Sequence, residues 1–438
     1  MPESQNIEYK VSWRDEYLKW IAGFANTEGG QLYIGINDHE EVKGIDNARK
    51  LLEDIPNKVR DVLGILVETK LHVKAEKEYL EIVVERYPYP ISYKGKYYIR
   101  SGSTLQELKG NALNKFLLER TGKKWDGVPV PGIEPKDLSL GALALFRQKA
   151  SNTTRIDKEV LDDADELLLE NLRLREGDML KRASVLLFHP DPEKFIPGAY
   201  TKIGFFRSDD DLVFQDEVHG SLMEQVDKVY DLLITKYTRS AIEYSGVSRV
   251  EKDLFPREAL REALLNALVH KDYAEATPVQ ISVYPDHIVF WNPGQLPENW
   301  TANTLKSKHP SKPFNPDLAN ALFRCGDIES WGRGTIKMIK ESVKGKILPP
   351  EFNTEMSGMM VSFFSNAKDF LKSKEMKAVH IKVVLYVLEN SRISNGGVQD
   401  LCEVSKATAT RYLTELEGEY LERVGKTGEG TYYKLKGS

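Results

Sequence analysis

The chain has 438 residues, which is too long for one ordinary hydrophobic core and predicts two to four domains. Its formal net charge of -5 excludes a broadly basic protein that binds nucleic acid indiscriminately, so any contact with nucleic acid has to be local. The two cysteines, Cys325 and Cys402, lie far apart and no apolar run is long enough to cross a bilayer. These features exclude a disulfide framework and predict a cytoplasmic protein without a membrane partner.

Roughly the first 120 residues predict a compact α+β unit. Apolar spacing predicts a helix over 13–26, and the alternating segment QLYIGIND predicts a strand that ends at Asp38. Two more strands are expected at 65–73 and 79–86. The segment KGKYYIRSGSTLQEL then predicts a hairpin followed by a helix that reaches about Glu119.

The amino-acid sequence of this unit is more specific than its pattern of predicted helices and strands. The segments PESQNIEYK, FANTEGGQLYIGIND and YYIRSGSTLQEL resemble the AlbA-like domain of bacterial regulators and of the Schlafen proteins, and place such a domain at 1–122. In the Schlafen group, two glutamates and an aspartate form a metal-dependent RNA-cleaving site. The resemblance carries these roles over onto Glu3, Glu8 and Asp38, with Lys10 following the second glutamate.

Three converging carboxylates repel one another unless a divalent cation neutralises them, and Mg²⁺ or Mn²⁺ prefers such oxygen ligands. The alternative is that Glu3 lies on a frayed terminus, Glu8 is a solvated strand residue and Asp38 caps a turn. Both interpretations stay open at this point.

The predicted hairpin also suits contact with nucleic acid. It combines cations with a stackable ring, which fits phosphates and splayed bases. The residues are Lys94, Lys96, Tyr98 and Arg100. The alternative is an exposed hairpin whose tyrosines cover the sheet.

The region 123–250 predicts a linker and a connecting α/β region. VPVPGIEP is the linker, RASVLLF predicts a short buried strand, YTKIGFFRS a second strand, and 222–237 a long amphipathic helix.

The segment 251–368 contains the densest set of candidate site residues. Glu262 and Asn266 are four residues apart on a predicted helix, so their side chains share one face. There the carboxylate could polarise a water and the amide oxygen could ligate Mg²⁺. Two later turns, at Gly294 and at Gly332 and Gly334, would let the backbone approach a base and a phosphate chain.

Together these elements resemble the ATP-binding fold of the gyrase, Hsp90, histidine kinase and MutL group, in the variant of RecG-like proteins and transcriptional regulators. The resemblance implies a gyrase-type α/β sandwich that binds ATP and Mg²⁺. The family's adenine-reading aspartate is represented here by Asn292, which leaves ATP hydrolysis by Glu262 open. The alternative is an amphipathic helix followed by ordinary turns.

The last segment, 375–438, predicts three helices and a hairpin, and it resembles a winged helix-turn-helix. Its DNA-facing residues would be Lys406, Thr408, Thr410, Arg411 and, on the wing, Lys426. Glutamates at the end of the third helix would confine that surface to the helix start. Such a fold can also serve in dimerisation or packing.

The predicted fold class is therefore a multidomain α/β protein. The first functional hypothesis is a nucleic-acid-binding, ATP-responsive transcriptional regulator, expected as a homodimer because gyrase-type modules often dimerise. The alternative is a metal-dependent nuclease of the Schlafen type that acts on RNA or single-stranded DNA under nucleotide control. A third is an interaction scaffold with a degenerate ATP fold. A helicase motor is not expected because no Gly-x-x-x-x-Gly-Lys-Ser/Thr loop occurs.

Overall fold

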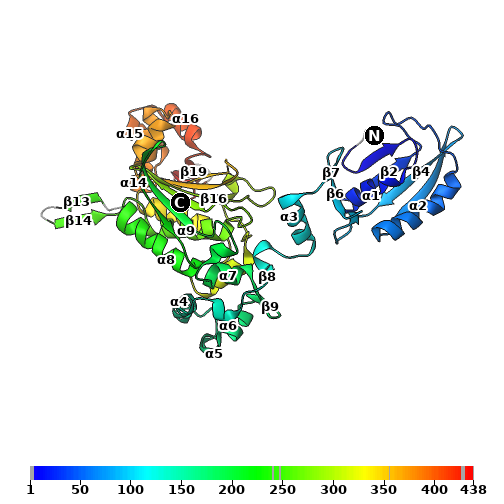
Figure 1. Ribbon diagram of the computed structural model, residues 1–438. Helices are drawn as coiled ribbons and strands as arrows, with labels where there is room; N and C mark the ends of the chain where they lie inside the picture. Colours follow the sequence, from blue (N-terminus) through cyan, green and yellow to red (C-terminus); the bar gives the residue numbers. More distant parts are fainter. Residues whose placement is uncertain (1–3, 239–240, 246–247, 355, 426–429, 438) are drawn as a thin grey trace. The chain divides into compact units, whose positions relative to one another are not determined.

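The computed structural model describes residues 4–238, 241–245, 248–354, 356–425 and 430–437. The chain divides into two compact units, Met1–Lys124 and Trp125–Ser438, and each is described by itself (Figure 1). Across the described ranges, no helix combines the length and the apolar character that crossing a membrane requires.

The first unit is built on a four-stranded sheet. Its strands, in their order across the sheet, are β1 (Ile7–Lys10), β2 (Gly30–Ile34), β4 (Lys77–Val84) and β3 (Glu68–Lys74). The pairing of β1 with β2 is parallel and the other two pairings are antiparallel. Two helices, α1 (Leu18–Ala25) and α2 (Ala48–Leu63), cover the face on which Leu32 and Ile82 are fully buried (Figure 1).

A smaller sheet completes this unit and confirms the predicted hairpin and helix. It consists of β5 (Ser92–Tyr93), β6 (Lys96–Ser101) and β7 (Thr104–Glu107), and α3 (Gly110–Arg120) follows it. The turn after α1 holds the small sheet in place. Asn26 donates to the carbonyl of Ile91 at 2.7 Å, and the backbone N–H of Arg100 donates to Thr27 at 2.9 Å.

The second unit contains a six-stranded sheet. Its strands, in order, are β12 (Asp211–Val218), β11 (Thr201–Ser208), β15 (Val279–Val283), β16 (His287–Pro293), β18 (Gly358–Phe364) and β17 (Glu351–Asn353). The predicted division at 250 runs through this sheet, because β11 pairs with β15 in parallel from Thr201 to Phe205. One hydrophobic core accordingly extends from Ile133 to Phe363.

Helices cover this sheet and fill the space around it. They are α4 (Leu140–Ser151), α5 (Lys158–Asp162), α6 (Asp165–Asn171), α7 (Arg182–Phe188), α8 (Leu222–Leu232), which a π-turn extends over Leu233–Tyr237, α9 (Arg257–His270), α10 (Ala302–Leu305), α11 (Pro316–Arg324) and α12 (Gly334–Lys344). A three-stranded sheet of β8 (Pro129–Val130), β10 (Met179–Lys181) and β9 (Arg175–Glu176) and a hairpin of β13 (Ala241–Ser245) and β14 (Ser248–Lys252) complete it. Single 3₁₀ turns occur at Asp15–Tyr17, Trp125–Gly127, Pro135–Asp137 and Pro192–Lys194.

The prediction of a strand for RASVLLF is wrong, since these residues form α7. Every side chain from Ala183 to Phe188 is buried. A short helix that is buried on all sides shows no 3.6-residue periodicity, so its apolar run cannot be told from that of a buried strand.

The C-terminal part forms a core of its own, which we call the C-terminal core. Its elements are α13 (Ala367–Ser373), α14 (Ala378–Asn390), α15 (Asn395–Cys402), α16 (Lys406–Leu416), β19 (Leu421–Val424) and β20 (Tyr432–Leu435). The three helices α14 to α16 gather beside the hairpin of β19 and β20 (Figure 1). Ser394 and Ser405 cap the N-termini of α15 and α16, which explains where these helices begin.

A buried carboxyl near the start of the second unit makes its stability depend on pH. Asp126 is fully buried and accepts hydrogen bonds from the backbone N–H groups of Asp317 and Leu318, at 2.8 and 3.0 Å, at the start of α11. Burial raises its pKa from 3.8 to about 6. The folded chain therefore binds this proton more tightly than the unfolded chain. The resulting stability is complete below about pH 4 and is lost as the pH rises through about 6.

We expect Asp126→Asn, which keeps an acceptor oxygen without the charge, to be more stable than the wild type above pH 6. The expected difference in free energy of unfolding is on the order of 2–3 kcal/mol, and it should shrink toward pH 4. Urea unfolding at four pH values between 4 and 7.5 measures it. A difference that does not change with pH would contradict this explanation.

Candidate nucleotide site

The helix α9 carries a row of polar side chains, which we call the polar stripe, through the hydrophobic core of the second unit. Its apolar side chains are buried, while Glu262, Asn266 and His270 follow one another at intervals of four residues. This spacing places them on one face. All three line a cavity of about 130 Å³.

The amide of Asn266 has a defined orientation. Its nitrogen donates to the carbonyl of Glu262 at 2.7 Å and lies 3.3 Å from the Glu262 carboxylate. Since the nitrogen is engaged with α9 itself, the amide oxygen is the atom that is left to accept or to ligate a cation. This donor set fits a hard cation such as Mg²⁺.

The glycine turn that begins α12 packs directly onto this stripe. A Cβ atom on Gly334 would lie 2.5 Å from the carboxylate of Glu262 and 3.0 Å from the Asn266 amide nitrogen. Gly332 has a φ of +62°, and a Cβ there would overlap with the carbonyl oxygen of His309. Gly334 therefore brings the N-terminus of α12 against α9, and Gly332 lets the preceding turn pack against His309, a closeness that no other residue type allows.

The N-terminus of α12 is suited to an anion. Arg333 precedes the helix, and no side chain among the described residues caps its first N–H groups. Such N–H groups and the helix dipole favour a phosphate. The N-terminus, the Glu262 carboxylate and the Asn266 amide together provide the parts that a magnesium-bound phosphate chain needs.

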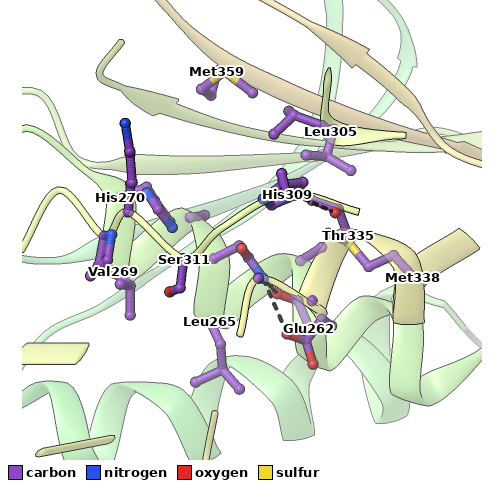
Figure 2. A pocket seen from close by; sticks show the side chains of 18 of the residues that line it. Glu262, Leu265, Val269, His270, Leu305, His309, Ser311, Thr335, Met338 and Met359 are labelled. Carbon is purple, nitrogen blue, oxygen red and sulfur yellow. Dashed lines mark hydrogen bonds between the residues drawn. The ribbon is translucent and has the colours of Figure 1, made fainter. Parts of the chain in front are cut away.

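The loop between α10 and α11 closes the cavity. His309 accepts from or donates to the Thr335 hydroxyl at 3.0 Å, and Figure 2 shows this contact beside Glu262 and Met338. The ring of Trp300 packs against His309 with a centroid separation of 4.8 Å. Leu305 and Met359 also line the cavity, and Figure 2 shows them across it from Glu262.

Burial changes the protonation of two groups in the stripe. Burial raises the pKa of Glu262, although Lys337, whose Nζ lies 3.8 Å from its carboxylate, opposes the shift. Burial, together with the neighbouring His309, lowers the pKa of His270 to about 4. His270 is thus a neutral imidazole at physiological pH.

The two predicted residues of the first glycine turn, Asn292 and Gly294, lie differently with respect to the cavity. Asn292 is buried and lines the cavity. Gly294 is not among the residues that line it. Its φ is +154°, and a Cβ there would lie 2.8 Å from the carbonyl oxygen of His270, so this glycine allows β16 to end against α9.

A network of ion pairs and hydrogen bonds fixes the segment between α11 and α12. Asp327 is nearly buried and accepts from Arg261 at 2.8 Å and from Lys149 at 3.2 Å. Arg155 donates to the carbonyls of Phe323 and Ile328. These contacts fix the chain that leads to the glycine turn.

The predicted metal site of the first unit is occupied by basic side chains. Glu8 is buried, with one carboxylate oxygen on Lys10 and the other 2.9 Å from the fully buried guanidinium of Arg100. Asp38 is exposed, and Glu3 lies outside the described residues. In the part of the chain that the structure describes, no group of three His, Cys, Asp or Glu side chains is placed to hold a metal ion. The nuclease hypothesis stays a prediction.

Most of the predicted nucleic-acid contacts lie at the surface, with Arg100 as the exception. Lys94, Lys96, Lys406, Thr410 and Arg411 are exposed, while Tyr98 and Thr408 are half-buried and Lys426 lies outside the described residues. Arg100 instead donates to the backbone carbonyls of Ser4 and Gln5 and pairs with Glu8. Its place is inside the first unit.

The cavity residues that were not predicted from the sequence include His270 and Met338. His270 continues the four-residue spacing of Glu262 and Asn266, so extending that motif by one more step would have found it. Met338 lies one turn into α12, and nothing in its sequence context distinguishes it from an ordinary core residue.

Two family models match the chain. The model described as "Schlafen, AlbA_2" matches residues 3–109, and the model described as "Putative ATP-dependent DNA helicase recG C-terminal" matches residues 276–363. The chain is therefore an AlbA-like protein with an ATPase-type module. These two domains indicate a nucleic-acid-associated protein that binds ATP.

Solved structures resemble the chain, whereas no curated protein matches it. A crystal structure of a protein from Corynebacterium diphtheriae has 18% sequence identity and a TM-score of 0.48, and the match covers 98% of this chain and 92% of that chain. The N-terminal domain of a RecG-related protein from Nitrosomonas europaea has 24% identity and a TM-score of 0.19, and the match covers 25% of this chain and 88% of that chain.

Proposed function

We propose that this protein is a nucleic-acid-binding regulator that responds to ATP and Mg²⁺. The observation that carries the proposal is the cavity. It gathers Glu262, Asn266, Asn292 and the glycine turn at Gly332 and Gly334 from three separate segments of the chain. In this assignment Asn266 ligates Mg²⁺, the N-terminus of α12 receives the phosphates, and Asn292 accepts from the adenine amino group.

The regulatory part of the proposal rests on the surface of the C-terminal helices. The third of them, α16, exposes Lys406 at its start and Arg411 in its second turn, while Glu415 pairs with Lys377 at 2.8 Å. A three-helix unit followed by a hairpin fits a winged helix that enters the major groove with this start. The first unit supplies a second, AlbA-like nucleic-acid surface.

The test is calorimetric titration of the full chain with ATP, in Mg²⁺ and in EDTA. We expect saturable, magnesium-dependent binding by the wild type. Asn266→Ala should lose at least about tenfold in affinity or lose the magnesium dependence, because the ligand oxygen is gone.

Asn57→Ala is the matched control. Asn57 is exposed on α2 and donates to the carbonyl four residues earlier at 3.0 Å, which is the bond that Asn266 makes on α9. This control should bind ATP as the wild type does. Equal binding by the wild type and Asn266→Ala would remove the central claim.

A further inference from the structure

The helix α12 joins two parts of the second unit that the proposed function treats separately. Its eleven residues, Gly334–Lys344, span about 16 Å. Its first turn lies at the nucleotide cavity, and the chain directly after its last turn lies at the C-terminal core.

At the cavity end, α12 is in contact with the groups that would bind the phosphates and the cation. Gly334 packs on Glu262 and Asn266, and the Thr335 hydroxyl lies 3.0 Å from His309. Lys337 reaches back to α9, where its Nζ lies 3.0 Å from the carboxylate of Glu258. A ligand at Asn266 therefore cannot bind without meeting this end of α12.

At the opposite end, the chain after α12 is bound to the last turn of α14. Lys346 adopts a φ of +62°, and its Nζ donates to the carbonyl of Glu389 at 2.6 Å and approaches that of Leu388 at 3.4 Å. The ammonium group thus caps the C-terminus of α14, where a cation is favoured. Leu348 and Val343 pack into the C-terminal core beside it.

Close packing against α9 extends along the whole length of α12. A Cβ on Gly345, which ends α12, would lie 2.5 Å from the ring of Pro256, which precedes α9. Glycines at both ends therefore hold α12 in direct contact with α9, and Met338 and Ile339 between them are buried. A packed contact of this kind responds to a displacement at one end by shifting as a unit.

We infer that α12 transmits occupancy of the nucleotide site to the three-helix C-terminal unit formed by α14, α15 and α16, with Lys346 as the residue that couples the two. The inference rests on the proposed function and adds its route of regulation. A phosphate drawn to the N-terminus of α12 displaces the helix relative to α9, and Lys346 carries that displacement to the end of α14. By reciprocity, a partner bound to the C-terminal unit alters the affinity for ATP by the same factor.

Hydrogen-exchange mass spectrometry of the full chain, with and without saturating ATP and Mg²⁺, tests this inference. In the wild type we expect ATP to change exchange at two places, the first turn of α12 and the last turn of α14. The change at α14 should be at least about fivefold, which is the lower end of ordinary coupling between sites. In Lys346→Met the change at α12 should persist and the change at α14 should disappear.

Two further variants separate coupling from loss of structure. Lys346→Arg keeps a cationic donor and should keep the response of α14. Lys344→Met removes a neighbouring lysine that is 78% exposed and pairs with Glu341, and it should behave as the wild type. Exchange of α14 without ATP shows whether Lys346→Met leaves the C-terminal unit folded, and Lys346→Arg decides the question if it does not.

The outcomes distinguish the two proposals. Protection at α12 without any change at α14 in the wild type overturns the coupling and leaves the nucleotide site intact. A response of α14 that survives in Lys346→Met overturns the role of Lys346. No response at either end overturns the proposed function, and the coupling with it.

Discussion

Gly334→Ala is expected to weaken the binding of ATP strongly while leaving the chain folded. The added methyl group would lie 2.5 Å from the Glu262 carboxylate and 3.0 Å from the Asn266 amide, so α12 has to move away from α9 or both side chains have to turn. Overpacking of this kind costs roughly 1–3 kcal/mol, and it falls here on the two groups assigned to the cation and the phosphates. Since 1.4 kcal/mol is a factor of about ten, we expect the affinity for ATP to fall by about 5- to 150-fold in calorimetric titration.

Gly141→Ala provides the control for this substitution. Gly141 is the second residue of α4, and a Cβ there would meet only the Ser139 hydroxyl at 3.6 Å and the Glu224 carboxylate at 4.0 Å. This variant should bind ATP normally. If Gly334→Ala bound ATP as tightly as Gly141→Ala, the phosphates could not lie between α9 and the start of α12.

Arg100→Met should destabilise the first unit by roughly 3–5 kcal/mol, because it leaves the buried Glu8 carboxylate without its guanidinium. The arginine side chain is fully buried, lies 4.8 Å over the ring of Trp20 and also donates to the carbonyls of Ser4 and Gln5. Its loss therefore removes the side-chain contacts that tie β1 and the preceding residues to β6, while the pairing of β1 with β2 remains. Urea unfolding, followed by exchange of the amides of β1 and β2, measures the change in the free energy of unfolding.

Lys96→Met is the matched control, since Lys96 belongs to the same strand but forms an exposed pair with Glu107 at 3.1 Å. Exposed pairs contribute about 0–1 kcal/mol. The double variant Glu8→Gln/Arg100→Met should recover part of the lost stability because no buried charge is left behind. A loss below about 1 kcal/mol in Arg100→Met would show that the buried pair is not what holds β1.

Local patterns predicted many of the elements because each has its own signal in the chain. The strand β2 was predicted by the alternation in QLYIGIND, and the three C-terminal helices were predicted within 375–438. The cavity residues Glu262 and Asn266 were found because their helical spacing is visible within five residues.

Contacts between distant segments left no comparable signal. The parallel pairing of β11 with β15 depends on residues that are more than seventy positions apart, and no local rule predicts it. Arg100 was predicted to face nucleic acid because it stands in a basic hairpin, yet the side chain faces Glu8 on another strand. An arginine on a strand is exposed or buried according to the face that it occupies, and only the fold decides the face.

The pairing of β11 with β15 also bears on how such a protein could be assembled from interchangeable parts. The matched ATPase-type segment begins at 276, but its first strand is bonded along one edge to 201–205 and along the other to β16. A gene rearrangement that carried only the matched segment would leave β15 as an edge strand without its partner β11, and unpaired edge strands promote aggregation. We therefore expect the preceding α/β region and the matched segment to be inherited together as one unit.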